Sequence, residues 1–158
     1  MNDIERLQAI DDIKRLKGSY CRFIDTKQWA AYGNLFAPDA ILEVNDYVDG
    51  PDGTPGVSEG KVIKMKGRGQ IVEQVSGLLK QCRTVHQVHS PEIEVTSPAT
   101  AKGIWAMEDR LRWTDRAISP IGLLFLHGFG HYHETYARQE GRWVIASLKL
   151  TRLSLENT

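Results

Sequence analysis

An aspartate interrupts an apolar strand face near the middle of the sequence. From Ala101 to Trp113 the odd positions are otherwise small or apolar, while the even positions include a lysine, a glutamate and two arginines. Alternation of this length predicts a half-buried strand, and it places Asp109 on the apolar face. A carboxylate there must find a partner, become protonated or line a wet cavity, because an unpaired buried charge is very costly.

Two histidines precede this strand on what reads as the opposing arm of a long β-hairpin over residues 84–113. His86 or His89 could be the partner of Asp109. A histidine beside a carboxylate in a pocket suits general acid and base catalysis. The alternative is a structural His–Asp pair that closes a polar gap in the core, and these residues alone leave both interpretations open.

Three further residues could take part in catalysis, and each also has a purely structural explanation. Tyr20 lies on the apolar stripe of an amphipathic helix over residues 3–23, where a core tyrosine usually needs only a hydrogen-bond partner. Asp25 precedes Gln28 by three residues, which is the arrangement of a capping box. Arg152 ends the apolar face of the last strand, where a snorkelling arginine is the alternative.

A metal site is not expected. His127, His131 and His133 all occupy odd positions of a predicted strand over residues 121–136, so their side chains would share one face of it. Residues two apart on a strand lie nearly 7 Å apart and splay, and no helical HEXXH spacing is present.

Composition excludes several classes of partner. Twenty Lys and Arg residues balance twenty Asp and Glu residues, so no net field attracts nucleic acid or an anionic membrane. No apolar run approaches the length of a membrane span. Cys21 and Cys82 fall on apolar helix stripes without metal or redox spacing, and residues 1–15 lack the apolar core of a signal peptide. We therefore expect a cytoplasmic protein with reduced cysteines.

The order of predicted elements indicates an α+β domain. A helix over 3–23 and a helical stretch around Trp29 precede a short strand over 41–44, a Gly- and Pro-rich loop over 45–60 that could act as a lid, and a strand over 61–66. A helix over 68–82 and long antiparallel strands follow. The length suits one domain spanning residues 1–158, with the helices against a strongly curved sheet that encloses an apolar cavity.

The series Tyr20, Asp25, His86, Asp109 and Arg152 resembles the SnoaL-like branch of the nuclear-transport-factor-2-like superfamily. This superfamily includes polyketide cyclases, scytalone dehydratase, ketosteroid isomerase and bile-acid 7α-dehydratase, and the last of these is the most similar at the site. The likeness extends from the first helix to residues 148–153. Gly130 and Tyr132 replace polar groups of scytalone dehydratase, which argues against scytalone as the substrate.

The resemblance implies a cone-like fold and a cofactor-free reaction. It assigns His86 as a base oriented by Asp25, Tyr20 as a hydrogen-bond donor to an enolate oxygen or leaving hydroxyl, and Asp109 as a proton donor if it is protonated. Arg152 would hold a polar substituent of the substrate. The reaction class is a dehydratase or isomerase acting on a hydrophobic, polycyclic hydroxy-carbonyl compound of steroid or polyketide type.

Further expectations concern binding and assembly. The residues expected to contact substrate are Trp29, His89, Trp105, Met107, Phe129 and His131. Aromatic residues on the long strands, such as Trp113, Phe125 and Tyr136, suggest a homo-oligomer, a dimer or trimer. A polyketide cyclase acting by intramolecular aldol chemistry and a non-catalytic small-molecule-binding domain are the two competing functions.

Overall fold

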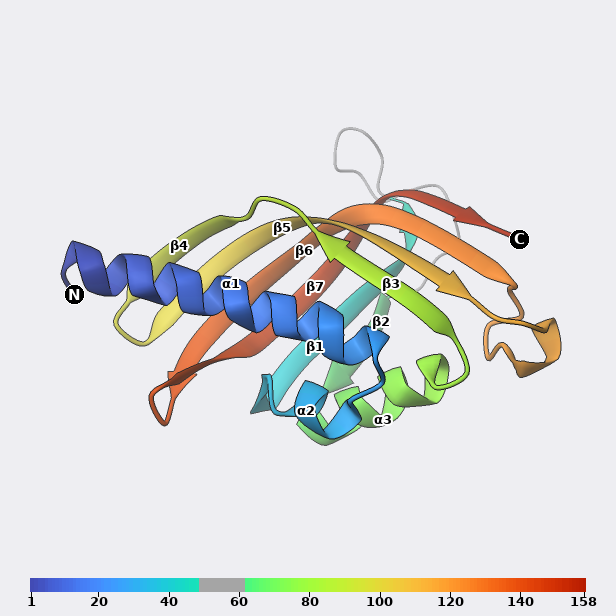
Figure 1. Cartoon of the computed structure of the whole chain (residues 1–158), viewed down its shortest axis with the longest axis horizontal. Coiled ribbons are helices and arrows are strands. Elements are labelled where there is room, and N and C mark those ends of the chain that lie inside the picture. Colours follow the sequence, from blue (N-terminus) through green and yellow to red (C-terminus); the bar gives the residue numbers. More distant parts are fainter. Residues whose placement is uncertain (49–61) are drawn as a thin grey trace.

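A curved, unclosed sheet of seven strands carries three α-helices in the computed structural model, which describes residues 1–48 and 62–158 (Figure 1). The strand order is β2-β1-β7-β6-β5-β3, and β4 also pairs with β5. The elements are α1 (Asp3–Asp25), α2 (Trp29–Gly33), β1 (Phe36–Val48), β2 (Val62–Lys66), α3 (Arg68–Leu79), β3 (Arg83–Val88), β4 (Glu92–Ser97), β5 (Thr100–Arg112), a 3₁₀ turn (Arg116–Ile118), β6 (Phe125–Gln139) and β7 (Arg142–Asn157).

The predicted α+β class, with helices on a curved sheet, is confirmed. All described strand pairs are antiparallel except β1 with β7, which is parallel. Helix α1 lies across one face of the sheet, and α2 and α3 gather beside β1 (Figure 1). No helix in the described ranges is long and apolar enough to cross a membrane.

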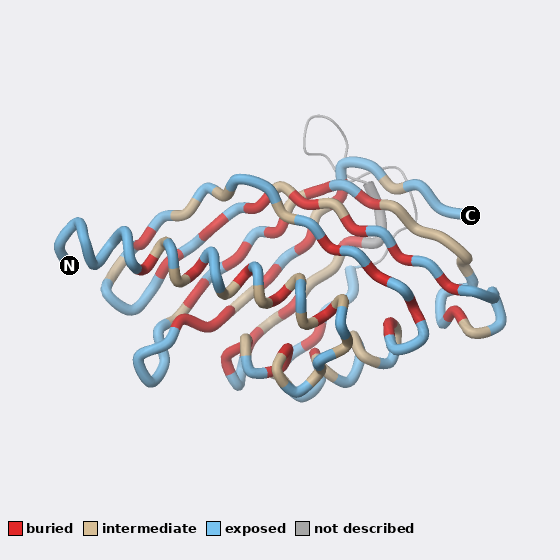
Figure 2. The backbone as a smooth tube through the Cα atoms, in the orientation of Figure 1, coloured by how far each residue is buried: buried red, intermediate tan, exposed pale blue. Residues whose placement is uncertain are grey.

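Strand β5 has the alternation that the sequence predicts. Its buried residues occupy every odd position from Ala101 to Leu111, and Asp109 is among them. Figure 2 shows buried and exposed stretches alternating along the strands beneath α1. The face toward α1, called the inner face below, therefore carries both the apolar core and the predicted site residues.

The buried stripe of α1 is rotated from the predicted one. Asn2 and Glu5 form a capping box at its start. The buried residues are Ala9, Ile13, Lys17, Tyr20 and Ile24, whereas Ile4 and Leu7 are 78% and 66% exposed. A lysine thus takes a core position that sequence patterning assigned to neighbouring apolar residues.

Asp25 does not cap the second helix, so the capping-box interpretation was wrong. It is the last residue of α1, and α2 begins after Gln28 without a side-chain cap. Its carboxylate contacts strand β3 instead. Between the two helices Lys27 has a φ of +61°, a backbone conformation that favours glycine.

The hairpin arm opposite β5 is divided at Pro91. Val88 pairs with Met107 and Glu92 pairs with Ile104, so the register moves by one residue between β3 and β4. A bulge at a proline has this effect, because one extra residue in the arm changes which face the even-numbered and odd-numbered side chains occupy. His86 and Val95 therefore both lie on the buried side although their positions differ in parity.

Strand β1 is longer than predicted. Residues 37–40, which precede the predicted strand over 41–44, form an irregularity within β1, where its register with β7 shifts between Phe36 and Ile41. Pro38 is tolerated there because a bulge does not need every backbone N–H. Residues 45–48 of the predicted loop belong to β1, and the remainder, 49–60, lies outside the described residues.

Gly130 permits close contact between β6 and β7 at another register shift. A Cβ atom at this position would overlap the backbone carbonyl of Thr151. Backbone cannot give way as a flexible side chain does, so a side chain here would force the two strands apart. The turn after β6 has positive φ at Glu140 and Gly141, as a type I′ hairpin requires.

We expect Gly130→Ala to lower the free energy of unfolding by about 2 kcal/mol or more, because overpacking against backbone is relieved only by breaking strand pairing. Gly77→Ala is the matched control. Gly77 lies in α3 with open space around its Cα, so this change should stabilise by about 0.5–1 kcal/mol. Urea unfolding measures both, and equal effects would contradict the steric argument.

Candidate active site

His86 and Asp109 are direct cross-strand partners on the inner face of the sheet. They face each other in the β3–β5 ladder, and both are buried, with exposures of 9% and 3%. Side chains opposite each other on one sheet face lie close together. The structure therefore brings these two predicted residues side by side, but each makes its strongest contact with a different residue.

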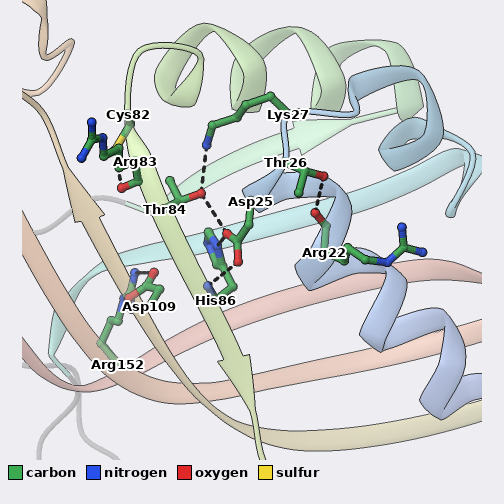
Figure 3. Close-up of polar contacts among 10 residues, drawn as sticks. All are labelled: Arg22, Asp25, Thr26, Lys27, Cys82, Arg83, Thr84, His86, Asp109 and Arg152. Atoms are coloured by element: carbon green, nitrogen blue, oxygen red, sulfur yellow. Dashed lines mark hydrogen bonds and ion pairs between the residues drawn. The ribbon is translucent and has the colours of Figure 1, made fainter.

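The carboxylate of Asp25 binds His86 from the end of α1 (Figure 3). Its Oδ1 lies 2.7 Å from Nδ1 of His86, and its Oδ2 accepts from the His86 backbone N–H at 2.9 Å. The Thr84 hydroxyl donates to Oδ1 at 2.8 Å. The Thr84 hydroxyl and the His86 backbone N–H both donate to this carboxylate, so we infer that the ring donates to it as well, that Nδ1 carries the ring proton and that Nε2 is the unprotonated nitrogen.

Asp109 forms a two-pronged ion pair with Arg152. Nη1 and Nη2 of Arg152 donate to Oδ1 and Oδ2 of Asp109 at 2.6 and 2.8 Å. Burial alone would lower the pKa of Arg152, but hydrogen bonds and charge from Asp109 raise it above its ordinary value. A permanently charged guanidinium favours the carboxylate form, so the hypothesis of a protonated Asp109 that donates a proton is not supported.

Gly128 makes room for this ion pair. Arg152 is on β7 and Asp109 on β5, so the guanidinium must cross β6 to reach its partner. It crosses at Gly128, which pairs with Asp109, and a Cβ there would overlap Nη1 of Arg152. The missing side chain is therefore a condition for the contact between two strands that are not neighbours.

Tyr20 lies among aromatic rings on the same side of the sheet. Its ring packs against Tyr32, Phe36 and Tyr132, with centroids 5.3 to 6.2 Å apart. Burial, followed by neighbouring tyrosine hydroxyls, holds the pKa of Tyr20 well above its ordinary value of 10.0. A neutral phenol at all moderate pH values can donate a hydrogen bond to a developing anion.

A second buried ion pair, between Lys17 and Glu134, escaped sequence analysis. Both side chains have no exposed surface, and the Lys17 ammonium lies 3.9 and 3.6 Å from the ring centroids of Tyr20 and Tyr132. Glu134 also accepts from the Tyr136 hydroxyl, which accepts from Nε1 of Trp105 at 2.8 Å. The available signal was Lys17 between Ile13 and Tyr20 at helical spacing.

The residues expected to contact substrate fall into two groups. Trp105 and Met107 are buried on the inner face, and Trp29 is half-buried beside Tyr32. His89 is exposed beyond the end of β3. Phe129 and His131 pair with Glu108 and Ala106, whose side chains belong to the outer face of the sheet. His89, Phe129 and His131 therefore lie apart from the predicted site residues of the inner face.

Two further expectations concern cavities and metals. A hollow of about 550 Å³ lies beside the N-terminal half of α1, lined by Ala9, Pro98 and Trp143 among others, and none of the predicted site residues lines it. Within residues 1–48 and 62–158 no three His, Cys, Asp or Glu side chains gather in a way that could hold a metal ion. The described inner face offers proton-transfer groups and a guanidinium.

Comparison with known proteins identifies the family. The SnoaL-like domain profile matches residues 5–149. The chain belongs to the SnoaL-like family. A curated relative, "Probable cyclase FGR4" of Gibberella zeae, is 28% identical over 147 residues, which is 92% of either chain.

Solved structures show the same fold at low identity. The "Putative Scytalone Dehydratase" of Novosphingobium aromaticivorans has a TM-score of 0.75 and 19% identity, covering 99% of this chain and 92% of its own. The hexachlorocyclohexane dehydrochlorinase LinA-type3 of Novosphingobium barchaimii has a TM-score of 0.74 and 16% identity, covering 99% and 94%. At these identities the likeness establishes the cone-like SnoaL fold alone.

Breaking the buried pair of this SnoaL-like protein should be more costly than removing it. We expect Lys17→Met to lower the free energy of unfolding by about 3–5 kcal/mol, because Glu134 is left buried and uncompensated. Adding Glu134→Gln should recover part of that loss, which a double-mutant cycle by urea unfolding detects. Lys102→Met, in the exposed pair with Glu94, should change stability by less than about 1 kcal/mol. If the stability loss of the double variant equals the sum of the losses of the two single variants, Lys17 and Glu134 are not coupled.

The buried tyrosines predict loss of stability in alkali. Burial raises the pKa of Tyr20 and Tyr132 in the folded state, whereas in the unfolded chain both ionise near pH 10. Their contribution is therefore intact below pH 10 and is lost as the pH rises toward the folded-state pKa, by about 1.4 kcal/mol per pH unit for each phenol. Tyr20→Phe should reduce this slope in urea unfolding between about pH 9 and 11. Identical slopes for both proteins would contradict the assignment.

Proposed function

We propose that this protein is a cofactor-independent dehydratase that transfers protons by general acid and base catalysis. The observation that carries the proposal is the Asp25–His86 contact, which directs Nδ1 of the imidazole to the carboxylate. Nε2 makes no hydrogen bond with any residue of the described ranges. A buried, oriented imidazole with one unengaged nitrogen has the form of a general base.

The first step would be removal of an acidic C–H proton α or γ to a carbonyl. Nε2 of His86 would accept the proton, and Asp25 would stabilise the imidazolium that results. The electrons of the broken C–H bond would pass to the carbonyl oxygen as an enolate. Tyr20, held neutral by burial, would donate a hydrogen bond to that oxygen.

The second step would be departure of a β- or vinylogous hydroxyl. The enolate would re-form the carbonyl and expel hydroxide, and the proton taken by His86 is the one available to convert hydroxide into water. Because Asp109 is paired with Arg152, we assign it to holding the guanidinium rather than to proton donation. Arg152 would then bind a polar or anionic substituent of the substrate.

The residues of the inner face support a proposal for the substrate class. Met107 and Leu111 flank Asp109 along β5, and Trp105 continues the apolar surface. An apolar surface around a few polar groups supports a hydrophobic, polycyclic hydroxy-carbonyl compound of steroid or polyketide type as the substrate. The dehydratase name of one structural neighbour and the dehydrochlorinase name of another describe eliminations on those proteins, and they support an elimination here.

Polyketide cyclisation is the second candidate. The relative named as a probable cyclase matches 92% of this chain, and this likeness favours ring closure over a purely binding role. An intramolecular aldol reaction would use the same base and oxyanion donor without a leaving hydroxyl. The structure of the product distinguishes ring closure from loss of water.

A homo-oligomer is also proposed, on different residues from those expected. Trp113 and Tyr136 are each 2% exposed and cannot form a self-association surface. Val85, Ile104 and Phe129 are large apolar residues with 38–50% exposure on the outer side of the sheet. These residues support association through that face.

The test of function is turnover of a 3-oxo-Δ4-steroid that carries a 7-hydroxyl group, followed by mass spectrometry for loss of water. We expect His86→Ala to reduce turnover roughly 10²- to 10⁴-fold, because it removes the base. His127→Ala is the matched control, since His127 is on the outer face and contacts Glu108. Full activity of His86→Ala would remove this histidine from the mechanism.

Deuterium exchange separates catalysis from simple binding. Incorporation of solvent deuterium at the carbon α or γ to the carbonyl, dependent on His86, is expected even where elimination is slow. A compound that binds but never exchanges would instead indicate a non-catalytic binding domain.

A further inference from the structure

A lysine lies at the far end of the hydrogen-bond chain that reaches His86. Nζ of Lys27 donates to Oγ1 of Thr84 at 2.9 Å, and the Thr84 hydroxyl donates to Oδ1 of Asp25 at 2.8 Å. Thr84 is buried, and Figure 3 shows Lys27 reaching toward it from the segment after α1. One continuous series of hydrogen bonds thus runs from Lys27 through Thr84 and Asp25 to His86.

The chemistry of these groups fixes the direction of every hydrogen bond in the chain. An ammonium group donates and cannot accept, so Thr84 must accept from Lys27 with a lone pair. A hydroxyl has a single proton, and Thr84 donates that proton in its hydrogen bond to Oδ1 of Asp25. Asp25 then receives hydrogen bonds only, and the ring nitrogen that faces it must be protonated.

The backbone of Lys27 adds an independent observation. Its φ of +61° lies in the left-handed region, where a glycine is the usual residue after a helix. The turn closes with a hydrogen bond from the Gln28 N–H to the Phe23 carbonyl. A lysine in this position is less favourable than a glycine, and strained positions of this kind concentrate at functional sites. Here the strained residue is the one whose side chain reaches Thr84.

We propose that Lys27 and Thr84 are positioning residues that hold Asp25 as an acceptor and so keep His86 in the tautomer with Nε2 unprotonated. Neither residue needs to touch the substrate. The effect on turnover rests on the proposed function, whereas the effect on the tautomer does not depend on any substrate.

The tautomer is measured directly by long-range ¹H–¹⁵N NMR of the histidine rings in the full chain without substrate, at a pH where the rings are neutral. We expect His86 of the wild type to be protonated at Nδ1. In Thr84→Val and Lys27→Gly the fraction protonated at Nε2 should rise, and in Thr84→Ser it should stay at the wild-type value. Protonation of the wild-type ring at Nε2, or an unchanged ring in both disruptive variants, would overturn the proposal.

The kinetic test separates positioning from a structural role. Thr84→Val and Lys27→Gly should each reduce kcat roughly tenfold or more with little change in KM, because a hydrogen bond to a charged group is lost away from the substrate. Lys27→Gly should keep or raise the melting temperature, since glycine relieves the positive φ. Glu140→Gly, which relieves the positive φ of Glu140 in the β6–β7 turn, should leave kcat unchanged. A Lys27→Gly protein with wild-type kcat would also overturn the proposal.

The two experiments distinguish this proposal from the proposed function. If the tautomer changes in the variants as expected but no wild-type turnover of any hydroxy-carbonyl compound occurs, the positioning role stands and the dehydratase assignment fails. If the wild type is active and the variants alter neither the tautomer nor kcat, the dehydratase assignment stands and the positioning role fails.

Discussion

The carboxylate of Asp25 joins the end of α1 to strand β3, and the arrangement of the candidate site depends on this contact. It accepts from the backbone and the ring of His86 and from Thr84. The C-terminal end of a helix is an unfavourable place for an acidic side chain, because the helix dipole favours cations there, and Asp25 is the last residue of α1. The unfavourable position is offset by three donors, and the helix axis, the strand and the imidazole are thereby fixed relative to one another.

The inner face is organised by charge pairs that each link elements distant in sequence. Asp109 and Arg152 join β5 to β7 across Gly128, and Lys17 joins α1 to Glu134 on β6. Buried ion pairs contribute little net stability compared with apolar packing, but loss of one partner is severe. Such pairs tolerate few different arrangements, so they specify how the curved sheet and the helix fit together more than they strengthen the fold.

The sequence predicted the fold class and the alternation of β5, because the order of the elements and the period of the apolar residues can both be read from local patterns. It also singled out Asp25 and His86, but it offered a cap for Asp25 that the structure excludes. The partner of Asp109 could not be derived, because it depends on which strands become second neighbours in the sheet. Phe129 and His131 lie on the outer face, and the inner-face residues that flank Phe129 in β6 are Gly128 and Gly130, which carry no apolar signal that could reveal the orientation of the strand there. Lys17 was missed because a charged residue within a helix is ordinarily assigned to solvent.

The balance of charge on the inner face has a consequence for how a ligand enters. Lys17 with Glu134 and Arg152 with Asp109 are each neutral as pairs, and Lys27 lies one hydroxyl away from Asp25. An interior whose charges are compensated at short range exerts no long-range pull on ions in solution. The affinity of an uncharged, apolar ligand of the kind proposed above would then depend on the water released on binding and hardly at all on ionic strength.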